Sequence, residues 1–211
     1  MEKAQAISDL EFIKKTMKAS TRYTNIPPMG YLLSGLFGLA GPFYTWLYLG
    51  AEKVGDPARI TFYDVVILAI AWLTILLAAA FSSAVFSVLR ARRLGKSAWN
   101  SLVARMLGSQ VPLLFAAGIL TIAMAAAKQY SLIPGIWLIS YGLVLFSLYF
   151  FTGKDHLIQS VVFLALGAAS LFSPAQASLI LLAAGFGATN LFFGIRGLLK
   201  EKEVYETGPA Q

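Results

Sequence analysis

Six stretches of mostly apolar residues, most of them about as long as a bilayer is thick, constrain the fold of this chain more than any other feature. A helix needs about 20 apolar residues to cross the hydrocarbon core. The six predicted spans are residues 31–50, 62–89, 111–127, 133–151, 157–172 and 177–199. Because lipid offers the backbone no hydrogen-bond partners, such segments must be helical. The sequence therefore predicts an all-α integral membrane bundle with six transmembrane helices.

The composition and the connections agree with this architecture. Only 13% of the 211 residues are charged, whereas a soluble chain is about a quarter charged. Turn-forming residues separate the spans, for example Gly55-Asp56-Pro57 before the second and Ser173-Pro174 before the sixth. These connections are short, so successive helices should be antiparallel neighbours. Within the first span, Pro42 is expected to interrupt the helix.

Lys and Arg residues predict the orientation, because cytoplasmic connections carry an excess of them. In a six-span chain, 14 of the 17 basic residues fall on the side of the two termini. The three on the other side are Lys53, Arg59 and Lys128. We expect the chain to lie in a bacterial inner membrane with both termini on the cytoplasmic side. The net charge of +7 then reports orientation and not an affinity for nucleic acid.

The N-terminal region, residues 1–29, is expected to hold a short amphipathic helix. Ser8 and Glu11 have the spacing of a capping box. Lys14, Lys15 and Lys18 share the face opposite Leu10, Ile13 and Met17. Such a helix is suited to lying on anionic headgroups at the cytoplasmic surface; a solvated linker helix is the alternative. Residues 30–199 would form the transmembrane domain and 200–211 a cytoplasmic tail.

A second basic segment follows the second span and contains Arg90, Arg92, Arg93 and Lys96. The prediction is contact with anionic lipid headgroups on the cytoplasmic side. A docking surface for an acidic cytoplasmic protein, or for a phosphate-bearing ligand, remains an alternative.

Residue types that carry chemistry are scarce. The chain has no cysteine and one histidine, His156, which excludes thiolate metal sites and any site that needs two imidazoles from one chain. We predict no catalytic residues, metal or cofactor. Asp155 is expected to cap the fifth span, and a pH-sensing or hydrolytic role for His156 is the functional alternative.

Small residues form stripes on three predicted spans. Stripes of this kind let helices approach closely, within one chain or between two copies. The predicted helix-packing residues are Gly30, Ser34 and Gly38 in the first span and Ala183, Gly187, Asn190 and Gly194 in the sixth. The second span adds Thr74, Ala78 and Ser82. Asn190 is expected to bond across to a neighbouring helix; a ligand-binding amide is the alternative.

Residues 11–17 (EFIKKTM), 134–138 (PGIWL) and 183–187 (AAGFG) resemble a family of small, uncharacterised bacterial multi-span membrane proteins. The resemblance implies the architecture and no activity. Residues 30–34 (GYLLS) and 135–140 (GIWLIS) are weakly alike, which would fit two inverted three-span halves.

These features favour a non-enzymatic membrane protein, either sensory or an accessory subunit of a larger membrane complex. Its partners would be anionic lipids and a membrane protein or a second copy of the chain. The alternative is a small-solute transporter or channel with a cavity lined by Asn190, Thr74 or Thr121. An intramembrane enzyme built on His156 is the third hypothesis.

Overall fold

The computed structural model describes residues 27–95 and 97–207, and every regular element within these ranges is a helix. The elements are α2 (Pro28–Gly55), η1 (Pro57–Arg59), α3 (Phe62–Arg93), α4 (Ser101–Ala126), η2 (Tyr130–Leu132), α5 (Ile133–Thr152), α6 (Lys154–Leu171), α7 (Ala175–Leu182), η3 (Ala183–Thr189) and α8 (Asn190–Thr207). The first five predicted spans each coincide with one helix. The sixth corresponds to α7, η3 and α8 in succession. The all-α prediction is confirmed for the described ranges, and the predicted N-terminal helix with Lys14, Lys15 and Lys18 lies outside them.

Five helical segments are long and apolar enough to cross a membrane. They are Pro28–Gly55, Phe62–Arg93, Ser101–Ala126, Tyr130–Thr152 and Ala175–Lys202. The chain is therefore a multi-pass membrane protein. Helix α6 is not among the five, because its 18 residues begin with the polar group Lys154, Asp155 and His156 and include Gln159.

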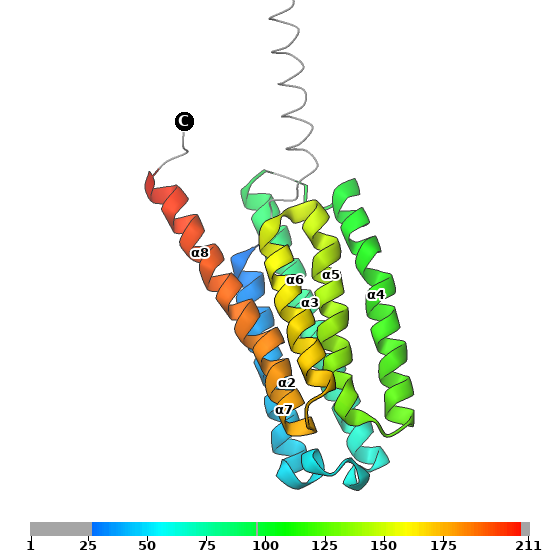
Figure 1. The fold of residues 1–211 in the computed structure, drawn as a ribbon. Helices are drawn as coiled ribbons and strands as arrows, with labels where there is room; N and C mark the ends of the chain where they lie inside the picture. Colours follow the sequence, from blue (N-terminus) through cyan, green and yellow to red (C-terminus); the bar gives the residue numbers. More distant parts are fainter. Residues whose placement is uncertain (1–26, 96, 208–211) are drawn as a thin grey trace, which may run out of the picture.

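The helices run alternately in opposite directions along the bundle (Figure 1). The α3–α4 and α5–α6 connections and the end of α8 lie at one end, which we call the basic end. The α2–α3, α4–α5 and α6–α7 connections lie at the opposite end (Figure 1). Described basic residues of the elements at the basic end are Arg90, Arg92, Arg93, Arg105, Lys154, Arg196, Lys200 and Lys202; those at the opposite end are Lys53, Arg59 and Lys128. The charge asymmetry in the sequence thus corresponds to two ends of one bundle.

The interior is built by α2, α5, α6 and the last helical segment, with α3 and α4 at the periphery. Buried Leu138, Leu145, Phe163 and Leu182 form the apolar core, contributed by α5, α6 and α7. Helix α3 packs along one side, against α2, and α4 packs against α5. Only two described residues of α3 and two of α4 are buried. Both peripheral helices therefore present most of their apolar surface outward.

Three side-chain contacts fix α3 to α2 along its length. The hydroxyls of Ser34 and Ser83 are 3.0 Å apart. The Trp72 indole donates to Thr45 Oγ1 at 3.0 Å, and Lys53 pairs with Asp64 at the opposite end. Lipid solvates an apolar helix as well as a neighbouring helix does, so the hydrophobic effect does not hold α3 against α2. Polar contacts of this kind contribute to the association instead.

The expectation that Pro42 interrupts the first span is wrong. Helix α2 continues through Pro42, which is buried, and its non-helical residue is Gly50, with φ 69° and ψ 169°. Proline is tolerated in membrane helices, and its cost here is the lost N–H donor to the Gly38 carbonyl, four residues earlier. Gly50 can adopt a positive φ because it has no Cβ, and it bends the chain toward η1.

Candidate functional site: a buried polar cluster around α6

One face of α6 brings polar side chains into the interior of the bundle. Its buried residues are His156, Gln159, Ser160, Phe163, Gly167 and Ser170, and spacings of three and four residues place them on a single face. Ser160 is satisfied locally, because its hydroxyl donates to the Gly142 carbonyl of α5 at 2.8 Å. His156 and Gln159 reach α2 and α8, and the Ser170 hydroxyl has no partner among the described residues.

Gln159 and Asn190 form an amide pair across the bundle. Gln159 Nε2 donates to Asn190 Oδ1 at 2.9 Å, and Asn190 Nδ2 donates to the Phe186 carbonyl at 2.9 Å. The two residues are 0% and 2% exposed. The predicted bond from Asn190 to a neighbouring helix is therefore present, and its partner is α6.

The direction of these bonds fixes which amide oxygen is left over. A backbone carbonyl only accepts, so Asn190 must present its NH₂ to Phe186 and its oxygen to Gln159. Gln159 must then donate with Nε2, which turns Oε1 away from the pair. No group among the described residues donates to this buried Oε1. An unpaired buried acceptor is uncommon in proteins, and this one follows from the bonding of its neighbours.

The amide pair borders a π-helical segment, η3, which spans seven residues, Ala183–Thr189. Within it the Thr189 hydroxyl donates to the Ala184 carbonyl, five residues earlier, at 3.1 Å. The Asn190 side-chain amide donates to the Phe186 carbonyl, four residues earlier. Segments of π-helix are rare and frequently mark functional sites. The sequence predicts an uninterrupted helix here, because the glycines that accompany η3 also suit close helix packing.

A second hydrogen-bonded chain lies one turn away on α6, toward the basic end. Thr152 donates its hydroxyl to the Leu148 carbonyl at 2.7 Å, so its oxygen accepts from His156 Nδ1 at 2.9 Å. His156 Nε2 is then the acceptor for the Tyr31 hydroxyl at 2.7 Å. The chain thus joins α2, α5 and α6 through a neutral imidazole whose two nitrogens are both engaged. Neither nitrogen of His156 is therefore free to bond to a further group.

The expectation that Asp155 caps the fifth span is wrong. The N-cap of α6 is Gly153, without a side-chain bond. Asp155 lies in the first turn and pairs with α8, to Arg196 at 3.4 Å and to Lys200 at 2.9 Å. The sequence could not indicate this, because the pairing needs α8 beside α6. The three side chains are well exposed, so we expect each pair to add little stability.

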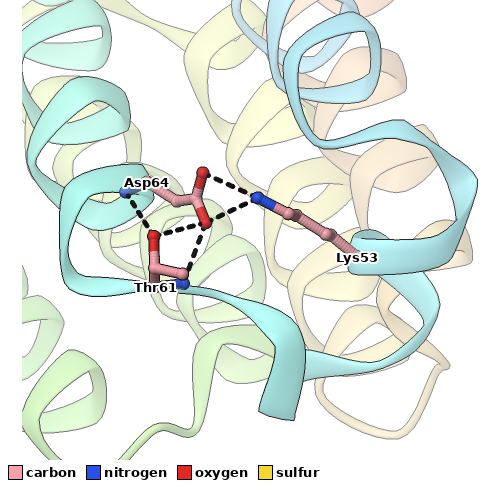
Figure 2. Close-up of polar contacts among 3 residues, drawn as sticks. All are labelled: Lys53, Thr61 and Asp64. Carbon is pink, nitrogen blue, oxygen red and sulfur yellow. Dashed lines mark hydrogen bonds and ion pairs between the residues drawn. The ribbon is translucent and has the colours of Figure 1, made fainter.

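At the opposite end, Asp64 gathers three donors (Figure 2). Lys53 Nζ reaches its two oxygens at 3.0 and 2.8 Å, and Thr61 donates from both its backbone nitrogen and its hydroxyl at 2.8 Å. Thr61 and Asp64 form the capping box that starts α3. The carboxylate is satisfied by a helix cap and an ion pair, so this cluster is sufficiently explained as the fastening of α3 to α2.

The predicted helix-packing residues fall at two interfaces. Gly30 and Ser34 face Ser83 of α3. Gly38, Gly187 and Gly194 lie where α2 meets η3 and α8: a Cβ on Gly38 would overlap the Phe186 carbonyl, and one on Gly194 would lie 2.7 Å from the Leu32 side chain. Asn190 adjoins the same interface, and Ala183, half-buried, begins η3. The sequence offered no means of dividing the residues between the two interfaces.

The predicted lipid-interface residues are in different environments. Arg90 is only 27% exposed and forms an ion pair with Glu201 of α8, whereas Arg92 and Arg93 are exposed at the end of α3. Lys96 lies outside the described residues. Contact of these residues with anionic headgroups stays a prediction, and Arg92 and Arg93 are its better-placed candidates.

The three residues expected to line a transport cavity do not converge. Asn190 is buried beside α6, Thr74 is exposed on α3 and donates to its own helix, and Thr121 accepts from Trp137 at the α4–α5 contact. Within the described residues, no three His, Asp or Glu side chains lie close enough to hold a metal ion.

Comparisons with protein-family models, with curated proteins and with solved structures found no match for this chain.

Proposed function

We propose that this chain is a non-enzymatic integral membrane protein of the bacterial cytoplasmic membrane, acting as a sensory or accessory subunit of a larger membrane complex. The observation that carries the proposal is the peripheral position of α3 and α4. Each packs on the bundle along one side only and leaves large side chains outward: Leu77 and Phe81 of α3 are 58% and 72% exposed, and Phe115 and Ile122 of α4 are 69% and 73% exposed. Contiguous apolar surface of this kind suits a second membrane protein as well as lipid.

The arrangement of the polar residues supports a role without catalysis. The imidazole of His156 is engaged on both sides, and the Asp64 carboxylate is engaged by Lys53 and Thr61. Both groups join neighbouring helices, His156 joining α6 to α2 and Asp64 joining α3 to α2, and these bonds account for their presence without a catalytic role.

The partner hypothesis predicts that the chain does not exist alone in the membrane. After extraction in a mild detergent, we expect native mass spectrometry of the tagged protein to show a defined oligomer or one stoichiometric membrane-protein partner. Replacing Leu77 and Phe81 of α3 by alanine should release it, while the same change at Leu138 and Leu145 inside the core should unfold the chain instead. A monodisperse monomer without a partner would count decisively against the proposal.

The same proposal includes six crossings with both termini in the cytoplasm. Helix α6 supports this count because it runs alongside α5 and connects the two ends of the bundle (Figure 1). Its polar first turns lie at the basic end, where Asp155 and Lys154 would reach the aqueous surface. The excess of basic residues at that end supports a cytoplasmic location.

Single-cysteine labelling tests the count, and the absence of native cysteine makes each label unambiguous. With six spans, Lys154→Cys should react with a membrane-impermeant maleimide only from the cytoplasmic side and Pro174→Cys only from the other. Ser97→Cys and Gln129→Cys are the matched controls for the third span, α4. Labelling of positions 154 and 174 from the same side would show that α6 does not cross.

A small-solute transporter is the second candidate, and one observation favours it. The unpaired Gln159 Oε1 beside a π-helix is a feature that a purely structural bundle would avoid.

A further inference from the structure

Two hydrogen-bond acceptors, one on α6 and one on α2, are left without donors by the bonding around them. Gln159 Oε1 is turned away from Asn190 and is unpaired. The Tyr31 hydroxyl gives its proton to His156 Nε2, so its oxygen can only accept further bonds. Tyr31 is bonded to His156, and His156 and Gln159 are three residues apart on one helix face, which makes them neighbours.

We propose that these two oxygens bind one small group that supplies two hydrogen-bond donors, either a water molecule or the NH₂ group of a small uncharged solute. Such a group would donate once to Gln159 Oε1 and once to Tyr31 Oη. It would join the Thr152–His156–Tyr31 chain to the Gln159–Asn190–Phe186 chain. The joined network would then run from the basic end to the π-helix and engage α2, α5, α6 and α8.

The two oxygens call for an occupant that donates. Each amide nitrogen of the pair keeps a second N–H, so the preference for a donor rests on Gln159 Oε1, which has no partner, and on Tyr31 Oη, which has already given its proton. The rings of Tyr141, Phe163 and Phe186 pack together one turn further along α6, with centroids 4.9 to 5.2 Å apart. The nearest carboxylate along α6, Asp155, is already paired with Arg196 and Lys200, and a neutral occupant is therefore favoured over a cation.

The π-helix gives the site its geometry. Because Asn190 donates to the Phe186 carbonyl, its oxygen is held toward α6, and Gln159 is held with Oε1 facing away. Gly38 allows α2, which carries Tyr31, to pack directly on this part of η3. The inference does not depend on the proposed accessory role.

The test uses the full chain in lipid bilayers and separates the two occupants. For water, we expect solid-state NMR to show magnetisation passing from water to the Gln159 side-chain amide faster than to the Trp72 indole, which is satisfied by Thr45. For the NH₂ group of an uncharged solute, acetamide should raise the Tm by about 2–4 °C, and N,N-dimethylacetamide, which has no N–H, should not.

Gln159→Met and Tyr31→Phe each remove one acceptor and should abolish whichever signal the wild-type protein gives. Tyr141→Phe is the matched control, since it removes the hydroxyl of a partly buried tyrosine of α5 without removing either of the two acceptors, and it should leave the signal unchanged. The wild-type measurements stand without the variants if these fail to fold. No water transfer at Gln159 together with no acetamide effect would overturn the proposal, and a signal that survives both acceptor variants would overturn the assignment to these two oxygens.

Discussion

Gly38→Ala is expected to lower the stability of the protein by about 2–3 kcal/mol, a fall in Tm of about 4–12 °C for a chain of this length. A Cβ at this position would overlap the carbonyl carbon and oxygen of Phe186. Backbone cannot rotate aside as a side chain can, so α2 would have to move away from η3. Thermal unfolding in detergent, followed by near-UV circular dichroism, measures the loss.

The control is the same substitution on α4. Gly108 and Gly118 have no atom within 4 Å of an added Cβ, so alanine there should be neutral or stabilise by about 0.5–1 kcal/mol through helix propensity. Because Asn190 bonds to the same Phe186 carbonyl, Gly38→Ala should also disturb the amide pair. Equal Tm values for the Gly38 and Gly108 variants would contradict the close contact between α2 and η3.

Phe163→Ala is expected to cost about 3 kcal/mol. Phe163 is fully buried and contacts the rings of Tyr141 and Phe186 at the centre of the core. In lipid the loss comes from packing, because an unfolded helix in the membrane is also in apolar surroundings. The cavity left by the ring therefore dominates the cost.

Phe115→Ala on α4 separates packing from simple hydrophobicity. Phe115 is 69% exposed on the outer surface of α4. Its replacement by alanine should change the free energy of unfolding by less than about 0.5 kcal/mol. If Phe115→Ala lowered the stability as much as Phe163→Ala, Phe115 would be packed against a partner. The measured sample would then be a complex and not the isolated chain. If neither lost stability, the core described for α5, α6 and α7 would be wrong.

The helices could be predicted from sequence because the signal for them is local. A run of apolar residues such as 62–89 or 133–151 identifies a helix by its length alone, and α3 and α5 begin where those runs begin. The unequal distribution of Lys and Arg likewise depends only on which connection a residue occupies. Bends in the helices were harder to predict from sequence. Proline breaks helices more strongly than glycine does, yet Gly50 and not Pro42 is the residue that leaves the helical conformation.

Side-chain partners could not be predicted because they depend on which helices become neighbours. Asp155 has the chemistry of an N-cap, and only the approach of α8 makes it an ion-pair partner of Lys200. His156 is one polar residue among several in the sequence, and Tyr31, 125 positions away, completes its bonding. The role of Gln159 could not be predicted, because a single amide in an apolar helix belongs to no motif. The one indication in the sequence is its position, three residues after His156 on the same helix face.

The sequence by itself determined that this chain is helical, that it crosses a membrane several times, and that its basic residues gather at one end. These properties follow from the length and charge of consecutive residues in a solvent that cannot bond to the backbone. Only the tertiary structure decided that η3 departs from the α-helix, that α3 and α4 are peripheral, and that an amide oxygen inside the bundle has no partner. Each of these depends on distances between residues far apart in the chain, where one carbonyl, Phe186, serves as the contact for both Gly38 and Asn190.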